Sequence, residues 1–495
     1  MQYNQNVLEL KKMYLDIILK KEEVLHRVLK RHIGSDYKIE NISRVWNPGG
    51  GSTLFKVLQK DTFFFLKVKH KSILTESKIE EEQDFSDKSS LQNEFEMMKE
   101  LENENFVPRI LFFDEEEDIQ FLAMEYIAGQ FVEQLESANL EETLACWDKL
   151  YVCVKRLYEL GIVHSDLHEH NIRFRNKNMD IVLIDFEESR YLKQDCCFEE
   201  SLDYCGRNEK SSLGEYVNAF KQSYMVRYNC LLRLNEIFKE KIAAKTIEYI
   251  KECNYDSSNG ICVAIDHGKS DKTYQSITNN YMHIAGQRAD MDRRIPLLRE
   301  LCKILFRDKY IFVDVGSNNG LFCREVSKSN NDVVKCIGLE GFPKFNILAR
   351  ALAFLEDCKN VEYYDFHCGE DELYFINNDE QCFITICSVW HHIQKKNDFL
   401  MQLKKLNIKY IFFEMAIQEE CYEGHSWEEE IKSIQKELNF SSYEIIGYSV
   451  DYNRPLILMT QSKLSDKEWK VIYRVSKKTL KVKKHRFRYF NGENQ

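Results

Sequence analysis

Residues 161–187 read GIVHSDLHEHNIRFRNKNMDIVLIDFE, and this stretch decides the fold predicted for the first half of the chain. His164 stands two residues before Asp166, Asn171 follows five residues later, and Asp185 closes the apolar run before the final phenylalanine. Phosphotransferases use a catalytic aspartate, a metal-binding asparagine and a second metal-binding aspartate in this order. The spacing therefore predicts a catalytic loop at Asp166, with Asn171 and Asp185 as Mg²⁺ ligands.

Composition and charge indicate an ordered protein of several domains. The chain has 495 residues, of which 44% are hydrophobic and only 5 are proline, so we expect two to four globular domains. Its net charge is 69 − 80 = −11, which argues against a protein built to coat nucleic acid. The 16 cysteines form no C-x-x-C pair and no run of eighteen uncharged apolar residues occurs, so we expect a cytoplasmic protein with reduced thiols and no zinc site.

The other parts of an ATP site precede the catalytic loop in the expected order. Gly49, Gly50 and Gly51 have no side chains to keep backbone N–H groups away from the phosphates. Lys67, late in a predicted strand at 62–68, would reach the α- and β-phosphates. Glu94, in a predicted helix, would hold that lysine by an ion pair.

The predicted hinge follows an apolar strand at 120–125. Its backbone at Glu125 and Ile127 is expected to bind adenine, while Asp166 accepts the proton of the acceptor hydroxyl. The ordered set predicts an ATP- and Mg²⁺-dependent kinase. A catalytically inactive descendant is the alternative.

The second half has the pattern of an open α/β sheet. Predicted strands alternate with helices, which indicates a mostly parallel sheet covered on both faces; they lie at 310–315, 333–339, 361–364, 382–387 and 409–414. The first strand leads through Asp314 into a turn containing Gly316, Asn318 and Gly320. Such a turn lets a cofactor approach the backbone closely.

The ends of the later strands carry residues that can bind the ribose and adenine groups of a nucleoside cofactor. Glu340 can bind both ribose hydroxyls, and Asp365 can hold an adenine amino group. Ser388, His391 and His392 follow the fourth strand at the carboxyl edge, where open α/β sheets place their sites. We expect one of the two histidines near a transferred methyl group; the alternative is one helix cap and one core residue. NAD is disfavoured as the cofactor because G-x-G-x-x-G is absent.

The first constellation resembles the protein-kinase-like superfamily, and within it the small-molecule and sugar kinases whose loop reads H-x-D-L-H. His168 occupies the last position of that motif, and Glu187 replaces the glycine of D-F-G. No proline lies between Pro108 and Pro296, so the A-P-E triplet that anchors a peptide-binding segment is absent. The resemblance therefore implies a glycan or small-molecule acceptor.

The second constellation resembles class I S-adenosylmethionine methyltransferases over residues 272–462. Together the two halves resemble the bifunctional enzymes that terminate O-antigen polysaccharides by phosphorylating and then methylating the terminal sugar. In that family a Tyr-Gln pair and an arginine contact S-adenosylmethionine, which implies these roles for Tyr274, Gln275 and Arg294. The family puts its methyltransferase first and adds a long coiled coil that docks a polymerase; this chain has the reverse order and no such coil.

The resemblance implies a glycan or lipid-linked polysaccharide substrate and a glycosyltransferase or polymerase partner. The basic, aromatic tail at 463–495 suits the inner face of an anionic plasma membrane, and a solvated C-terminus fits equally. Two other functions stay open. One is a kinase and methyltransferase that acts on RNA ends, which the net negative charge of the chain disfavours. The other is a scaffold with one inactive domain.

The predicted architecture is an α+β, bilobal protein-kinase-like domain followed by an α/β, Rossmann-like class I methyltransferase domain. An amphipathic helix precedes them, with apolar residues at helical spacing between 5 and 32. The predicted boundaries are 1–40 for the helical segment, 41–255 for the kinase, 256–271 for a linker, 272–462 for the methyltransferase and 463–495 for the tail.

Overall fold

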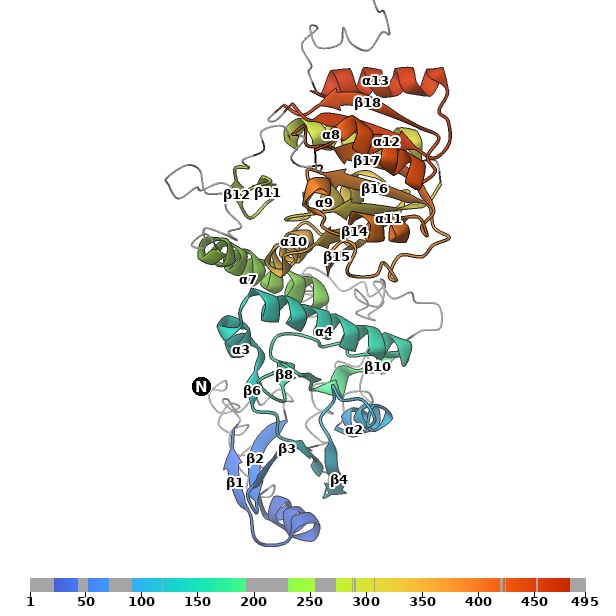
Figure 1. Cartoon of the computed structure of the whole chain (residues 1–495). Coiled ribbons are helices and arrows are strands. Elements are labelled where there is room, and N and C mark those ends of the chain that lie inside the picture. Colours follow the sequence, from blue (N-terminus) through green and yellow to red (C-terminus); the bar gives the residue numbers. More distant parts are fainter. Residues whose placement is uncertain are drawn as a thin grey trace, which may run out of the picture. The chain divides into compact units, whose positions relative to one another are not determined.

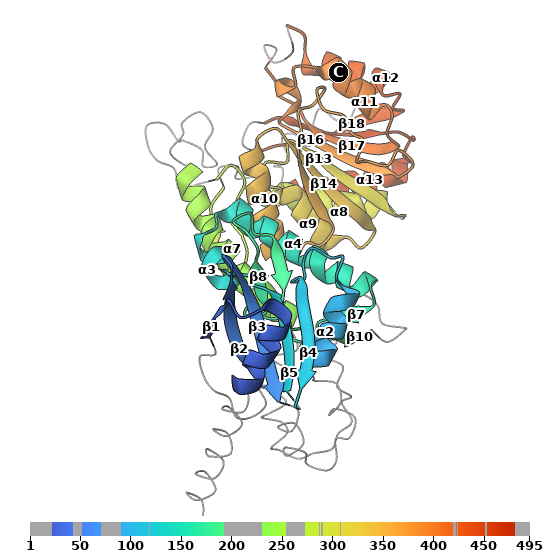
Figure 2. The same cartoon turned by 90° about the horizontal axis from the view of Figure 1, so that it is seen from below.

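The computed structural model (Figures 1 and 2) describes residues 22–42, 52–70, 91–117, 119–192, 230–253, 273–286, 288, 291–306, 308–418, 422, 424–450 and 453–480. Its contacts divide the chain into two compact units, Met1–Phe238 and Lys239–Gln495, which are described separately below. The division falls inside helix α7, earlier than the linker predicted at 256–271. That linker lies outside the described residues.

A five-stranded antiparallel sheet, in the order β1-β2-β3-β5-β4, begins the first unit. The predicted strands and the helix at 90–102 are confirmed. The elements of this unit are β1 (Lys38–Asn41), β2 (Thr53–Gln59), β3 (Thr62–His70), α2 (Leu91–Glu100), β4 (Ile110–Glu116), β5 (Ile119–Glu125), β6 (Gly129–Gln130), α3 (Phe131–Ser137), α4 (Leu140–Glu159), β7 (Ile162–Val163), β8 (Ile172–Phe174), β9 (Ile181–Leu183), the 3-10 turn η2 (Phe186–Glu188), β10 (Arg190–Tyr191) and the start of α7 (Cys230–Cys253).

The helix over residues 22–33 packs against this sheet (Figure 2). Val24, Val28 and Leu29 lie on one helical face and are fully buried against sheet residues that include Phe64 and Phe121. The helix and β1 are therefore part of the core of the first unit, so the boundary predicted at residue 40 does not separate them from the sheet. Residues 1–21 lie outside the described ranges.

Helix α4 and three small strand pairings hold the region of the catalytic loop. β6, β8 and β9 form one sheet, and β7 pairs with β10 through Val163 and Arg190. β10 forms this short antiparallel pair directly after the turn η2. Residues 193–229 lie outside the description, and α7 confirms the helix predicted up to 253.

A seven-stranded sheet forms the second unit, in the order β15-β14-β13-β16-β17-β19-β18. Five strands are parallel, as predicted, and β19 runs antiparallel between β17 and β18. The elements are β11 (Ile277–Thr278), β12 (His283–Ile284), α8 (Met291–Leu305), β13 (Tyr310–Val315), α9 (Leu321–Ser329), β14 (Val333–Glu340), α10 (Pro343–Leu355), β15 (Val361–Asp365), β16 (Cys382–Cys387), the 3-10 turn η3 (Trp390–His392), α11 (Lys396–Leu403), β17 (Ile408–Glu414), α12 (Trp427–Glu437), β18 (Ser442–Tyr448), β19 (Pro455–Thr460) and α13 (Asp466–Leu480).

Both faces of this sheet are buried, which explains its nearly continuous apolar strands. Residues of α8, α9 and α13 pack on one face, and residues of α11 and α12 pack on the other. The chain order of the strands reverses between β13 and β16, and open α/β sheets bind ligands at the carboxyl ends of strands beside such a reversal. Asp314, Glu340 and Ser388 lie at or directly after these ends.

Helix α13 corrects the tail predicted at 463–495. Its apolar side buries Ile472, Ser476 and Leu480, at a spacing of four residues, against the core of the second unit. Residues 466–480 therefore belong to the folded unit, while 481–495 lie outside the described part of the chain. Neither α13 nor another helix in the described ranges has the length and apolar composition needed to cross a membrane.

Candidate active sites of the two units

Lys67 lies at the centre of the first candidate site. It lies on β3 and its Nζ donates to Glu94 Oε2 on α2 at 2.7 Å and also to Asp185 Oδ1. Burial alone would lower the pKa of Lys67, but the carboxylates of Asp185 and Glu94 raise it above its usual value. The structure thus joins three predicted residues from distant parts of the sequence around one buried cation.

The turn predicted to bind a metal, at Asp185 and η2, is fixed by its backbone. Asp185 has a left-handed conformation, with φ of 69° and ψ of 60°, and Phe186 N–H donates to Glu94 Oε1 at 3.3 Å. Burial would raise the pKa of Asp185, but Lys67 outweighs it and lowers this pKa below the usual range. Asp185 is therefore an anionic carboxylate, the form that a Mg²⁺ ligand requires.

Hydrogen bonds order the catalytic loop. Asn171 Nδ2 donates to the backbone oxygen of Asp166 at 2.8 Å and to its Oδ2 at 3.1 Å. Because the amide nitrogen is used in this way, the amide oxygen of Asn171 is the atom suited to a metal. Burial lowers the pKa of His164, whose neutral ring donates from Nε2 to Ile184 O at 2.9 Å. His168 Nε2 lies 3.7 Å from Asp166 Oδ2.

The predicted adenine contacts are only partly described. Glu125 N–H donates to Arg109 O at 2.8 Å, and its carboxylate accepts from Arg175 Nε at 3.0 Å. Glu125 would therefore contact adenine only through its carbonyl oxygen, and Ile127 follows two residues after the end of β5. Gly49, Gly50 and Gly51 lie outside the described residues, so their predicted phosphate contacts stay a prediction.

In the second candidate site, close approach of the backbone explains both glycines of the turn after β13. Gly316 has φ of 73°, and a Cβ placed there would lie 2.6 Å from Val389 Cγ2. Gly320 has φ of 74°, and a Cβ there would overlap the Tyr363 ring. Asn318, at the middle glycine of the usual motif, has φ of 51°. Many cofactor-binding turns of this kind have glycine at this position, but asparagine tolerates the left-handed conformation, so Asn318 fits the same turn.

Carboxylates from neighbouring strands line this turn. Asp314 Oδ1 accepts from Thr385 Oγ1 at 2.6 Å, its Oδ2 has no hydrogen-bond partner in the described ranges, and burial raises its pKa to about 7. Glu340 Oε2 accepts from Asn318 N–H at 2.9 Å. Asp365 Oδ1 accepts from Asn346 Nδ2 at 2.6 Å. Three carboxylates thus end adjacent parallel strands, as the sequence predicted.

Sequence analysis missed a buried ion cluster at the end of β17. Glu414 accepts from Arg288 Nη2 and from Arg294 Nη1, each at 2.7 Å, and from Ser388 Oγ at 2.6 Å. Burial would raise the pKa of Glu414, but Arg294 and Arg288 lower it to about 2. Glu414 could have been found because it ends a predicted strand at the carboxyl edge. No sequence signal distinguished Arg288 from neighbouring arginines.

The Tyr-Gln pair lies beside the same turn. Gln275 O accepts from Asn319 Nδ2 at 3.0 Å, and Tyr274 OH accepts from Arg288 Nη1 at 2.7 Å. Arg294 meets Glu414 in the ion cluster just described. The three residues implied by the family resemblance are therefore connected to the glycine-rich turn or to the buried ion cluster; their contacts with a cofactor stay a prediction.

His391 and His392 lie in the turn η3 after β16, with ring centroids 4.0 Å apart. Burial and then His392 lower the pKa of His391 to about 4, so His391 is neutral at pH 7. His391 is half-buried and His392 exposed, and the core residue of this turn is Trp390, whose Nε1 donates to Glu430 Oε1 at 2.5 Å. Which histidine would face a transferred methyl stays a prediction.

Comparison with known proteins supports the kinase half most directly. The family model of the protein kinase domain matches residues 48–207, which include Lys67, Glu94, Asp166 and Asp185. Myosin light chain kinase family member 4 of Homo sapiens is 28% identical over 176 residues, or 34% of this chain and 43% of that protein. The chain thus spans less than half the length of this relative. A protein kinase domain model therefore matches within the predicted range 41–255, and the bounds of that range stay a prediction.

Similar solved structures include kinases and methyltransferases. The bifunctional kinase-methyltransferase WbdD is 20% identical, with a TM-score of 0.29, over 36% of this chain and 41% of that chain. A SAM-dependent methyltransferase from Aquifex aeolicus is 17% identical, with a TM-score of 0.27, over 34% and 94%. The Cydia pomonella granulovirus kinase PK-1 is 17% identical, with a TM-score of 0.26, over 34% and 57%.

The resemblance to a kinase joined to a methyltransferase, which the sequence predicts, has different support in its two parts. The kinase part of this resemblance has a family model behind it. The methyltransferase part depends on the geometry of the second unit, namely the strand order, the glycine turn and the carboxylates at the strand ends.

Proposed function

We propose that this chain is a bifunctional transferase, which phosphorylates a glycan with ATP and Mg²⁺ and methylates the product with S-adenosylmethionine. The observation that carries the proposal is the presence of two differently built sites on one chain. Lys67 meets Glu94 and Asp185 in the first unit. Asp314 and Glu340 border the glycine turn of the second.

The residues of the first unit suit phosphoryl transfer to a hydroxyl group. Asp166 would accept the hydroxyl proton as the acceptor oxygen bonds to phosphorus and the bond to ADP breaks, and general-base help of this kind contributes roughly 10²- to 10⁴-fold in rate. Asn171 orients the Asp166 carboxylate through its amide nitrogen. Asp185 and the Asn171 amide oxygen fit the preference of Mg²⁺ for oxygen ligands. Lys67 would compensate phosphate charge.

The second unit fits a nucleoside cofactor. Glu340 ends β14 where a ribose would lie, and Gly316 and Gly320 leave room for close approach to the backbone. The unpartnered Oδ2 of buried Asp314 suits a ligand that donates a hydrogen bond. S-adenosylmethionine would supply the methyl group, and an acceptor oxygen would take it as the carbon–sulfur bond breaks.

The proposed acceptor is the terminal sugar of a surface polysaccharide or of its lipid-linked precursor. The methyl group would go to the new phosphate or to a sugar hydroxyl. A phosphate monoester is already an oxyanion, so its methylation requires orientation more than a strong base. We also propose a glycosyltransferase or polymerase as a partner, and contact of the basic residues after 463 with the inner face of the plasma membrane.

Mass spectrometry of cell-surface glycans tests this proposal. Asp166→Ala should remove a phosphate together with any methyl carried on it, while Gly316→Arg should remove a methyl alone. Unchanged glycans in both variants would contradict the proposed acceptor. A salt-sensitive shift of RNA by the purified protein would then favour an RNA-end enzyme. Failure to bind either donor would favour a scaffold.

A further inference from the structure

Glu187 stands where related kinases have the glycine of D-F-G, and the roles proposed above leave it unexplained. Its carboxylate pairs with Lys69, which lies two residues after Lys67 on β3. Residues two apart in a strand lie on the same face, so both lysines lie on one side of the sheet. Lys69 is 6% exposed and Lys67 is 7% exposed. An ammonium group at this depth requires a partner.

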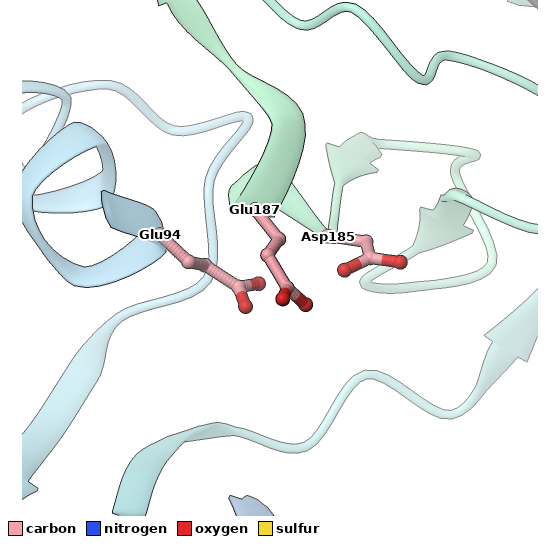
Figure 3. Close-up of side chains that lie close together, drawn as sticks. All are labelled: Glu94, Asp185 and Glu187. Atoms are coloured by element: carbon pink, nitrogen blue, oxygen red, sulfur yellow. The ribbon is translucent and has the colours of Figure 1, made fainter. Parts of the chain in front are cut away.

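Three carboxylates lie close together beside Lys67 and Lys69. Figure 3 shows Glu94, Asp185 and Glu187 directed toward one another, and one oxygen of each lies within 4.8 Å of the others. Three carboxylates and two lysines have a net charge of −3 + 2 = −1. Without Lys69 the same volume would hold three carboxylates and one lysine. Glu187 would then compete with Glu94 and Asp185 for Lys67.

Helix α2 holds the backbone of the turn on both sides of Glu187. Asn93 Nδ2 donates to Glu187 O at 2.8 Å and to Ser189 O at 3.0 Å. Phe186 N–H donates to Glu94 Oε1. These hydrogen bonds fix the backbone of Glu187 beside α2, and its carboxylate is balanced where it lies by Lys69.

We propose that Lys69 is a positioning residue of the phosphotransferase site. It neutralises Glu187 and keeps it from Lys67, so that Lys67 stays bound to Glu94 and Asp185 stays available to Mg²⁺. This inference rests on the proposed kinase function of the first unit. It differs from two other roles that the same geometry admits: Glu187 as a third metal ligand, and Lys69 as a direct contact of a nucleotide phosphate.

A double-mutant cycle on the full chain separates these roles. Binding of the non-hydrolysable analogue AMP-PNP with Mg²⁺ is measured by calorimetry for Lys69→Met, Glu187→Gln and the double variant. We expect Lys69→Met to weaken binding at least about tenfold, since an unbalanced carboxylate beside Lys67 opposes an anionic ligand. Glu187→Gln should stay within about threefold of the wild type. The double variant should recover to that level, because the neutralised carboxylate no longer needs Lys69.

Other outcomes would overturn the proposal. If Glu187→Gln alone weakened binding tenfold and raised the Mg²⁺ concentration needed for half saturation, Glu187 would be a metal ligand. If the double variant bound as weakly as Lys69→Met, Lys69 would contact the nucleotide itself. Under our proposal, Lys69→Arg should bind AMP-PNP as the wild type does, because arginine keeps the positive charge.

Matched controls separate positioning from folding. Lys149→Met removes a lysine from an exposed pair, 3.3 Å from Asp180, and should leave binding unchanged. Thermal unfolding of each variant reports whether it folds, and recovery in the double variant cannot come from a misfolded chain. A wild-type protein that bound no AMP-PNP would contradict the proposed kinase function. Binding by the wild type with no loss in Lys69→Met would contradict only the role of Lys69.

Discussion

The two candidate sites hold their charges in different ways. In the first unit, Lys67 is shared between two carboxylates, Glu94 on α2 and Asp185 before η2. In the second unit, Glu414 is fixed between two arginines whose side chains are 1% exposed, and glycines define the space beside β13. Under the proposed function, the shared lysine of the first unit suits a ligand of high negative charge, whereas the fixed arginines and the glycines of the second unit suit a ligand recognised by its shape.

The largest expected effect tests the first unit. Asp166→Asn should lower phosphoryl transfer by about 10²- to 10⁴-fold, because the acceptor hydroxyl loses its general base. Affinity for MgATP should change little, since Asp166 is not among the residues proposed to hold it. The measurements are phosphate incorporation by mass spectrometry and calorimetry with AMP-PNP. Asp180→Asn, at an exposed aspartate directly before β9, serves as the control.

The buried ion cluster predicts a large effect on stability in the second unit. Glu414→Gln leaves two buried guanidinium groups without their carboxylate and should cost about 3–5 kcal/mol in the free energy of unfolding. Thermal or urea unfolding measures this loss. Glu437→Gln, at an exposed pair with Lys404, should change stability by less than about 1 kcal/mol. Equal stability of the two variants would show that the cluster is not fixed.

The same cluster predicts a pH dependence. The pKa of Glu414 is about 2 in the folded chain against a usual value of 4.5, so its ionised form is favoured by folding. Its contribution is therefore complete above about pH 4.5 and is lost as the pH falls toward 2. The wild type should lose stability over this range more steeply than Glu414→Gln. Parallel curves of stability against pH would contradict the assignment.

Substitution of a glycine tests whether the shape of the second site decides cofactor binding. Gly316→Ala should weaken S-adenosylmethionine binding by more than about tenfold, because the added Cβ meets Val389 at 2.6 Å in a left-handed conformation. Gly424→Ala is the matched control: its φ is 89°, but nothing lies within 4 Å of the added Cβ. It should cost about 1 kcal/mol of stability, because alanine is strained in the left-handed conformation, without changing cofactor affinity. If Gly316→Ala and Gly424→Ala weakened S-adenosylmethionine binding equally, backbone strain and not the contact with Val389 would decide binding.

The smallest expected effect concerns Asn318. Asn318→Gly should change cofactor affinity by no more than about twofold, because both residues adopt φ near 51° and the backbone N–H still donates to Glu340. Calorimetry with S-adenosylmethionine measures the difference. A large loss would mean that the Asn318 side chain itself contacts the cofactor. The two sites would then differ less than we infer, since side-chain chemistry would matter in both.

Much of both sites could be predicted because their residues stand at fixed places along the chain. Asp166, Asn171 and Asp185 are close in sequence, and Asp314, Glu340 and Asp365 each follow or end an apolar strand. Arg288 lies in no motif, and its pairing with Glu414 joins residues 126 apart. Such a pairing depends on how α8 and the segment before it pack against the sheet. The spacing of apolar residues along the sequence does not predict that packing.

The sequence by itself determined the order of the elements, the residue types of both sites and the apolar faces that drive packing, because these follow from local spacing and side-chain chemistry. Only the tertiary structure decided which charges meet. It placed α13 in the core of the second unit, paired Glu187 with Lys69, and enclosed Glu414 between two arginines. Burial gives these contacts their strength, and burial is a property of the folded chain.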